Sequence, residues 1–341
     1  MNKKLLSIIK YALLLAISVT LLLLAFRGMD LKKIMWEIVS ANMFWVAVSG
    51  FISIVAFVVR AHRWNLLIEP MGYSPSLKNT TYSVMVGYLA NYFVPRLGEV
   101  TRCGALSKAE SVPFNKLLGT VIVERIIDVF SLLLCIILAS FLERKRLGNF
   151  FTVNIFEPLV SKFQKLGNSP LLIVTSILFI TGLIITLIYF IKKSRKKDAD
   201  SGISKIIKGF IDGLRSVANL KRPWLFIFQS VFIWVLYYFG VYVSLFAFPF
   251  TSGLGAGTAL FLLVAGGIGM SAPVQGGIGA YHLFVSQGLV LYGVLKENGL
   301  AFATMLHGLQ LILVILLGIT SMFLLFSARK KTGANSIVVK N

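Results

Sequence analysis

Charged side chains stand beside helix-breaking residues at one place in an otherwise apolar stretch. The group follows an apolar run directly and comprises Asn91, Pro95, Arg96, Gly98, Glu99 and Arg102. Proline and glycine interrupt a helix, and hydrocarbon cannot satisfy the backbone groups that they free. Two arginines beside such a break suit bidentate contact with phosphate. The spacing predicts a site for a polar ligand, although a cytoplasmic loop with an Arg–Glu pair explains the same residues.

A second group of charges lies in the first turns of an apolar helix predicted over residues 119–142. Glu124 and Asp128 are four residues apart and share a helix face, and Arg125 lies about 100° around the helix. Ionisable groups at membrane depth cost about 2.5–3.5 kcal/mol each and are usually paired and functional. We expect the two carboxylates to neutralise arginines, including those of the preceding broken segment. They either fix that segment only or contact a substrate directly.

Glycines and polar residues form a third group within residues 271–282. Gln275, Gly276, Gly277 and His282 are candidate ligand contacts, because backbone N–H groups at a helix N-terminus suit anions. Close helix packing through small residues is the alternative. His282 fits a polar residue at an interface, a contact to lipid phosphate, or a proton carrier.

Arg60, Arg63 and Trp64 close the second apolar span. A belt of arginine and tryptophan at headgroup depth accounts for them, or Arg60 reaches inward to the acidic pair. His62 and His307 are interpreted as interface residues. No group of His, Cys and Asp residues has the spacing of metal ligands, and no catalytic residue, metal or other cofactor is predicted.

The composition indicates that these groups belong to a membrane protein. The chain has 341 residues, of which 57% are hydrophobic and 14% charged, with a mean hydropathy of +0.84. Soluble domains have about 45–50% apolar and about 25% charged residues. The net charge of +21 has no nucleic-acid-binding motif beside it. The predicted fold class is therefore an all-α polytopic membrane protein with no nucleic-acid partner.

Apolar runs define the expected elements. Six are long enough to cross about 30 Å of hydrocarbon, at about residues 9–26, 44–61, 119–142, 170–191, 223–248 and 300–326. Two shorter runs, 80–94 and 257–272, end in Pro/Gly clusters and are predicted to be broken or re-entrant. Residues 280–295 either form a hairpin with the preceding run or cross fully. Amphipathic helices at the interface are expected at 31–42 and 203–219.

Lysines and arginines set the expected orientation. With both termini cytoplasmic and 80–94 re-entrant, 24 of the 34 basic residues fall on the cytoplasmic side of a cell membrane. Three spans in each half give the halves opposite orientations, as in an inverted repeat. The halves would be 1–142 and 143–331, followed by a cytoplasmic tail at 332–341. Any protein of eight membrane segments can also be halved in this way.

Together the three motifs resemble the family of lysylphosphatidylglycerol synthase transmembrane regions, also described as flippase-like. The resemblance covers nearly the whole chain and implies a single flippase-like domain over residues 1–331. Two features depart from the family pattern. Val274 and Gln275 separate Pro273 from the glycine pair, and His282 stands where an acid is expected.

The resemblance implies a lipid transporter or flippase for an anionic phospholipid or a polyprenyl-phosphate-linked lipid. Membrane lipids would be its partners, and the oligomeric state is left open. Arg96 and Arg102 would contact phosphate, while Glu124 and Asp128 hold those arginines or exchange with the headgroup. The turn at 276–282 would complete the cavity.

Two other functions compete with transport. One is a polyprenyl-phosphate glycosyltransferase of the dolichol-phosphate type, for which the nearest Asp-x-Asp motif, Asp198 to Asp200, lies in a basic loop. The other is a membrane scaffold that transports nothing. About 15 residues follow the last expected span, so an aminoacyl-transferase domain is not expected, and a transporter is favoured over an enzyme.

Overall fold

The computed structural model describes residues 3–144 and 219–338, which contain helices and no strand. The expected span at 170–191, nearly all of the amphipathic segment at 203–219 and the Asp-x-Asp motif lie outside the described residues. The chain divides into two compact units, and every feature below belongs to the first, residues 1–142 with 209–341.

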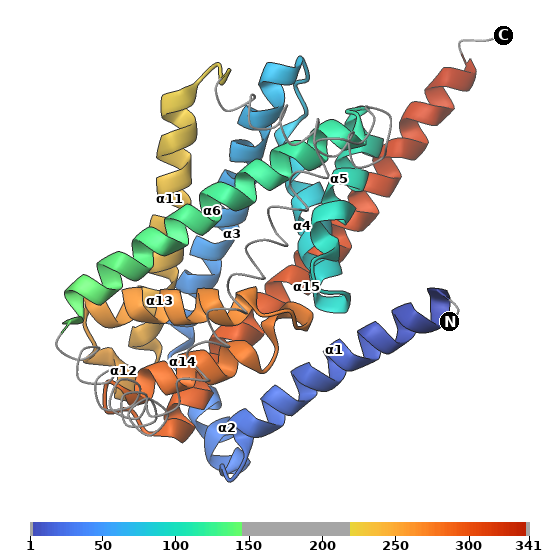
Figure 1. The fold of residues 1–341 in the computed structure, drawn as a ribbon. Coiled ribbons are helices and arrows are strands. Elements are labelled where there is room, and N and C mark those ends of the chain that lie inside the picture. Colours follow the sequence, from blue (N-terminus) through green and yellow to red (C-terminus); the bar gives the residue numbers. More distant parts are fainter. Residues whose placement is uncertain (1–2, 145–218, 339–341) are drawn as a thin grey trace, which may run out of the picture. The chain divides into compact units, whose positions relative to one another are not determined.

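The first half begins with a bent pair of helices and a long helix (Figure 1). These are α1 (Lys3–Phe26), α2 (Leu31–Val39) and α3 (Met43–Ile68), followed by the short η1 (Glu69–Met71). Gly28, with φ of 74°, follows the end of α1, and Asp30 caps α2 by accepting hydrogen bonds from two backbone N–H groups. α1 and α2 meet at 88°. The helix predicted near 31–42 is thus confirmed as a separate element.

A helical hairpin follows, made of α4 (Leu77–Phe93) and α5 (Leu97–Glu110), and leads into α6 (Phe114–Leu142). Pro95 and a left-handed Arg96, with φ of 64°, form the break. α4 and α5 have 17 and 14 residues, or about 26 and 21 Å, less than the hydrocarbon thickness. The predicted helix break is confirmed, but residues 97–110 are a helix packed on α4, whereas a loop was expected there.

The second half contains a matching hairpin. α11 (Pro223–Ser244), η3 (Leu245–Ala247) and α12 (Pro249–Ser252) lead to α13 (Ala256–Ser271). After η4 (Gln275–Gly277), α14 (Ala280–Val290) packs back on α13. These two helices have 16 and 11 residues, about 24 and 17 Å long, so a hairpin fits residues 257–295 and two complete spans do not.

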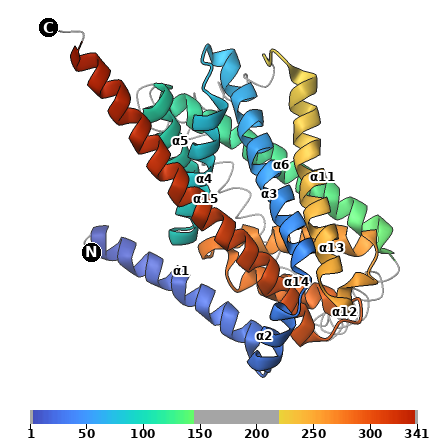
Figure 2. The same ribbon diagram turned by 180° about the vertical axis from the view of Figure 1, so that it is seen from behind.

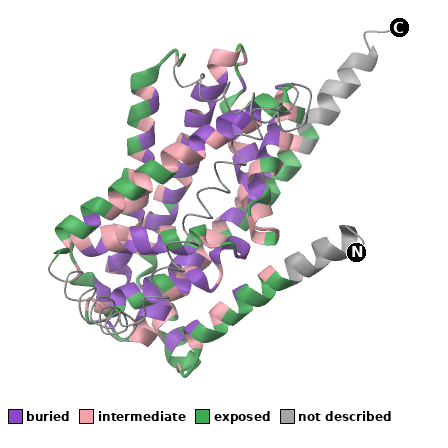
Figure 3. Cartoon of the chain, in the orientation of Figure 1, coloured by how far each residue is buried: buried purple, intermediate pink, exposed green. Residues whose placement is uncertain are grey.

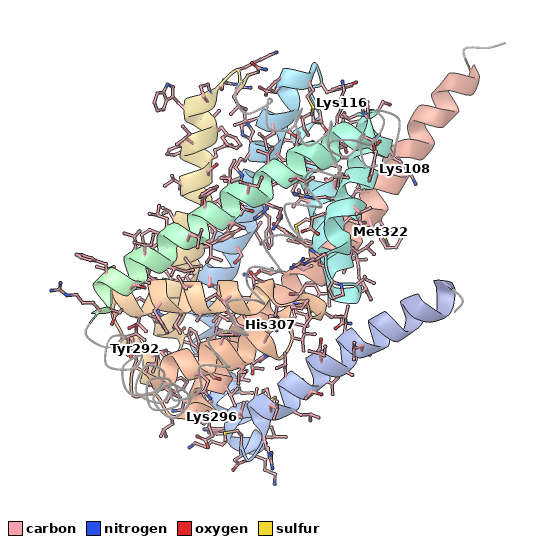
Figure 4. The ribbon with its side chains drawn as sticks, viewed as in Figure 1. Lys108, Lys116, Tyr292, Lys296, His307 and Met322 are labelled. Atoms are coloured by element: carbon pink, nitrogen blue, oxygen red, sulfur yellow. The ribbon has the colours of Figure 1, made fainter. Side chains whose placement is uncertain are left out.

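The last helix, α15, runs from Lys296 to Val338. It is 43 residues long, and the predicted tail at 332–341 therefore begins inside a helix. In Figure 4, Lys108 and Lys116 lie at the opposite end of the helices from Lys296. The expected placement of these lysines on opposite sides of a membrane stays a prediction.

Three of the described helices are long and apolar enough to cross a membrane: α3, α11 and α15. The bent pair α1–α2 makes a fourth if it is one span. α6 is 29 residues long and carries the predicted acidic pair in its first half. The all-helical membrane class is confirmed. Six full spans are not confirmed, and the region that would hold one of them is not described.

The two halves pack against each other through their long helices and their hairpins. α3 packs along α11, where Ser49 Oγ donates a hydrogen bond to the Gly240 carbonyl at 2.9 Å. α4 of the first hairpin packs against α15, and α13 of the second packs against α6 (Figure 2). Buried residues concentrate on these mutual contacts, whereas α1 is largely exposed (Figure 3). The order of long helix, hairpin and long helix thus occurs twice among the described residues, and an inverted orientation of the two halves stays a prediction.

Gly98 provides a test of the first hairpin. A Cβ at Gly98 would collide with the Gly87 carbonyl and the Asn91 amide, whereas a Cβ at Gly104, on the same helix, meets nothing within 4 Å. We expect Gly98→Ala to lower stability by about 1–3 kcal/mol through overpacking. Gly104→Ala should be neutral or stabilising by up to about 1 kcal/mol. Thermal unfolding in detergent measures both, and equal melting temperatures would contradict the packing described.

Candidate functional site

The carboxylate of Glu124 is the centre of a buried ionic cluster. Its side chain, on α6, is 0% exposed and contacts three arginines. Oε1 lies 2.8 Å from Arg60 Nε and 3.2 Å from Arg63 Nη2. Oε2 accepts a hydrogen bond from Arg102 Nη2 at 2.9 Å. One carboxylate therefore joins α3, α5 and α6.

Asp128, one helical turn after Glu124, binds two of the same arginines. Arg60 Nη2 donates to Asp128 Oδ2, and Arg63 Nη2 lies 2.8 Å from Oδ1. The arginines also reach α11, where Arg60 Nη1 donates to the Tyr237 hydroxyl at 3.1 Å. Arg60 and Arg63 are three residues apart on α3, a spacing that places both on one helix face. That face meets the acidic face of α6.

Arg102 completes the cluster and keeps one edge without a partner. Its guanidinium carbon lies 4.7 Å from the centre of the Trp64 ring, a cation–π contact. Trp64 is fixed in turn, because its indole N–H donates to Thr120 at 2.8 Å. Arg102 is 3% exposed, yet its Nε and Nη1 have no hydrogen-bond partner among the described residues. Buried polar atoms normally have such a partner.

Glu99 and Arg125 extend the cluster to the protein surface. Arg125 Nε lies 3.7 Å from Glu99 and its Nη1 lies 3.9 Å from Asp128. The Arg125 side chain is 42% exposed. Both residues line an open groove of about 340 Å³ whose other lining residues are apolar: Leu118, Val121, Ile122, Ile126, Val129 and Phe130. The ionic cluster thus meets an apolar groove that runs along one face of α6 and reaches Glu99 of α5.

The charges of this cluster do not balance. Arg60, Arg63, Arg102 and Arg125 oppose Glu99, Glu124 and Asp128, which leaves one positive charge. A buried ion pair is stable only when its charges are compensated and hydrogen-bonded. An anion is the simplest partner for the surplus charge and for the unpaired edge of Arg102.

Arg63 and Trp64 were wrongly assigned from the sequence to a belt at headgroup depth. Both side chains are fully buried, in contact with α5 and α6. Arginine and tryptophan at a helix end are typical of an interfacial belt, so these residue types alone do not indicate that the side chains point into the protein. The three-residue spacing from Arg60 was the signal for it, since the suggestion that Arg60 reaches the acidic pair is confirmed.

Two residues of the first motif lie outside the ionic cluster. The Asn91 side chain accepts a hydrogen bond from Gly98 N at 2.7 Å and closes the turn between α4 and α5. Arg96 is exposed at that turn, and among the described residues it has no ion pair with Glu124 or Asp128. Lipid contact by either residue stays a prediction.

The third motif forms a separate buried group. The Gln275 side chain accepts a hydrogen bond from Ser18 of α1 at 2.6 Å. A Cβ at Gly276 would enter the Tyr92 ring, and one at Gly277 would meet Met270. The two glycines thus permit close packing, the alternative weighed for them. Contact of this group with a ligand stays a prediction.

The histidines of this group are also inside the protein. His282 lies beside His307, which hydrogen-bonds to the Gly276 carbonyl at 2.8 Å. Among the described residues, no cluster of three or more His, Cys, Asp or Glu side chains is placed to hold a metal ion.

The chain matches the family model described as the lysylphosphatidylglycerol synthase TM region over residues 11–318. It belongs to this family. The resemblance carried by the three motifs is thereby confirmed, and the protein is a multi-pass membrane protein of the lysylphosphatidylglycerol synthase TM type.

A curated relative is the UPF0104 membrane protein MJ1595 of Methanocaldococcus jannaschii. It is 32% identical to this chain over 124 residues, which make up 36% of this chain. The match spans 37% of the length of that relative. No solved structure matches the chain.

Glu124 and Glu99 give a matched test of the cluster. Glu124→Gln would leave three buried guanidinium groups without their shared carboxylate, and we expect a loss of about 3–5 kcal/mol in stability. Glu99→Gln removes a longer, partly exposed pair and should cost less than about 1 kcal/mol. Denaturation of the purified proteins in detergent gives the comparison. Similar losses for the two variants would show that Glu124 does not organise the helices.

Proposed function

We propose that this protein moves an anionic lipid between the two leaflets of a cell membrane. The observation that carries the proposal is the surplus positive charge of a buried arginine cluster that meets an apolar groove. Membership of the lysylphosphatidylglycerol synthase TM family supports a lipid as the ligand. An anionic phospholipid and a polyprenyl-phosphate-linked lipid share the phosphate group on which the argument rests.

Arg102 supplies the donors that a phosphate group would need. Its Nη2 is engaged by Glu124, whereas Nε and Nη1 are free of partners within the described chain. Arginine presents such donors in a fixed, planar fork that matches phosphate oxygens. The stacking on Trp64 holds the plane of the guanidinium in place, so little conformational entropy would be lost on binding.

The groove along α6 suits the apolar part of a lipid. Its apolar side chains stand beside the Glu99–Arg125 pair. A lipid in this groove would keep its acyl or prenyl chain against apolar surface and its phosphate beside Arg125, the arginine of the cluster that lines the groove. The hydrophobic tail would therefore never need to enter the ionic cluster.

Glu124 would keep the binding reversible. It already holds Arg102 through Nη2, so a phosphate that arrives at Nε and Nη1 would share the charge of this guanidinium with a carboxylate already in place. A site whose anion-binding groups are engaged internally holds its ligand less tightly than a site of free arginines. A transporter needs this property, because the lipid must leave on the other side.

A leaflet-resolved flip assay tests the proposal. Proteoliposomes would contain fluorescent phosphatidylglycerol as the anionic probe or fluorescent phosphatidylcholine as the zwitterionic one. We expect the wild-type protein to translocate the anionic probe faster, and Arg102→Gln to reduce that rate at least tenfold, since a charge-assisted contact is worth about 1.5–3 kcal/mol.

Arg222→Gln is the matched control. Arg222 is an exposed arginine that pairs with Glu69 away from the cluster, and its loss should leave the rate unchanged. Wild-type rates in a folded Arg102→Gln protein would overturn the assignment of this cluster. Rates equal to those of protein-free liposomes for the wild type, with both probes and with a polyprenyl phosphate, would favour the scaffold.

A further inference from the structure

A second buried polar group lies at the tip of the second hairpin. Its titratable members are His282 of α14 and His307 of α15, whose residues are 6% and 4% exposed. Figure 4 places His307 beside the ribbon of this hairpin. The two imidazole rings are perpendicular, with centroids 4.9 Å apart. No hydrogen bond or ion pair joins the pair to the arginine cluster in the described part of the chain.

The hydrogen bonds of the pair leave basic nitrogen available. His307 Nε2 lies 2.8 Å from the Gly276 carbonyl, and because a carbonyl can only accept, Nε2 carries the hydrogen. The Nδ1 atom of a neutral His307 is therefore the basic nitrogen. His282 Nδ1 is buried and has no hydrogen-bond partner among the described residues. Each ring can thus accept a proton, but two charges at this distance would repel each other.

The surroundings of the pair contain no counter-charge. Tyr281 stacks on His307 at 5.2 Å, Phe26 of α1 lies 6.0 Å from His282, and Tyr92 of α4 lies 6.3 Å from His307. Among the described residues, the titratable groups facing the pair from α1, α4, α13, α14 and α15 are the two tyrosines. A proton on the pair would be a buried charge without compensation, which is costly.

The hairpin tip is closed around this uncharged pair. Ser18 of α1 donates to Gln275, and the left-handed Gly276, with φ of 54°, lies against Tyr92. Gly279, with φ of 83°, packs on the backbone of α1 at Leu22. A charged pair would need water or an anion beside it, and the closed tip leaves room for neither. We therefore expect the tip to fit against α1 and α4 only while the pair is uncharged.

We propose that His282 and His307 form a site for a single proton, and that proton uptake releases the tip of the second hairpin from α1 and α4. One N–H bond forms at a ring nitrogen, no bond breaks, and the charge of the pair changes from zero to +1. The closed tip disfavours the charged pair, so protonation shifts the equilibrium toward an arrangement that admits water or an anion beside the pair. The size of the shift is the ratio of the proton affinities of the open and closed arrangements. This inference does not depend on which lipid the protein moves.

Nuclear magnetic resonance can observe the proton directly, because the chain has only three histidines. The protein, with ¹⁵N-labelled imidazoles, would be placed in phosphatidylcholine nanodiscs, which contain no anionic lipid. At about pH 8 we expect His307 as the Nε2–H tautomer, and acidification to about pH 4 should add one proton to the pair, because a buried charge without compensation resists protonation at the pH typical of an exposed histidine. His307→Asn should then change the titration of His282. His62 bonds to Gln229 outside the pair, and His62→Asn should leave that titration unchanged.

The release of the tip is a distance that spin labels can measure. Ser271 and Leu23 are exposed beside the tip and on α1, and Ser271→Cys with Leu23→Cys provides the labels after Cys103→Ala and Cys135→Ala. We expect the distance to lengthen between about pH 8 and pH 4 with wild-type histidines and with His62→Asn, and to stay constant when His282→Asn and His307→Asn are combined.

Two results would overturn the inference. One is a pair of imidazoles that stays neutral throughout this pH range in the folded protein. The other is a label distance that does not change while the pair takes up its proton. Both measurements use the wild-type histidines, so they decide the matter even if a histidine variant fails to fold.

Discussion

The burial of one carboxylate, Glu124, among three arginines is the constraint on which the first half of this protein depends. Those arginines come from α3 and α5, and the carboxylate comes from α6. Apolar surroundings make an uncompensated charge costly, so each of these helices can be placed only where the others supply the opposite charge. Apolar packing alone would allow α6 to slide or rotate on α3. The ion pairs specify one register and one rotation.

The same constraint explains why the site is not fully satisfied. The cluster holds three helices together and leaves Nε and Nη1 of Arg102 without partners among the described residues. Its buried side, at Glu124 and Arg63, is closed, whereas the side at Arg125 and Glu99 opens to the groove. The rigid part and the accessible part are thus adjacent and share Asp128. Such a network can lose or gain one contact at its exposed end while its buried end still holds the helices together.

Long apolar runs and helix-breaking residues made most of the helices predictable. The runs at 44–61, 119–142 and 300–326 each lie within a single helix, because only a helix can satisfy its own backbone in hydrocarbon. α5 was not predicted, since its 14 residues are nearly half polar or charged and no amphipathic pattern marks them. A helix of this kind is stabilised by the hairpin partner, which sequence periodicity does not reveal.

The candidate site was predictable to the extent that local spacing determines it. Glu124 and Asp128 share a face for reasons internal to α6, and the proximity of Arg102 followed from the broken segment that directly precedes this helix in the sequence. The place of Arg63 in the site could not be predicted in this way. It depends on which face of α3 meets α6, and packing between distant segments decides this. For Arg96, the left-handed turn decides the direction of the chain, and the residue type gives no sign of it.

The contact between α4 and α15 has a consequence for biosynthesis. α4 ends near residue 93, whereas its packing partner begins at Lys296. The first hairpin is therefore made some 200 residues before the helix that covers α4, so the face of α4 at Met85 and Leu89, which packs on α15, must wait in the translocon or in lipid until α15 is made. Contacts this distant in sequence form late and slowly. Such a protein should depend on insertion chaperones during translation more than its final stability suggests.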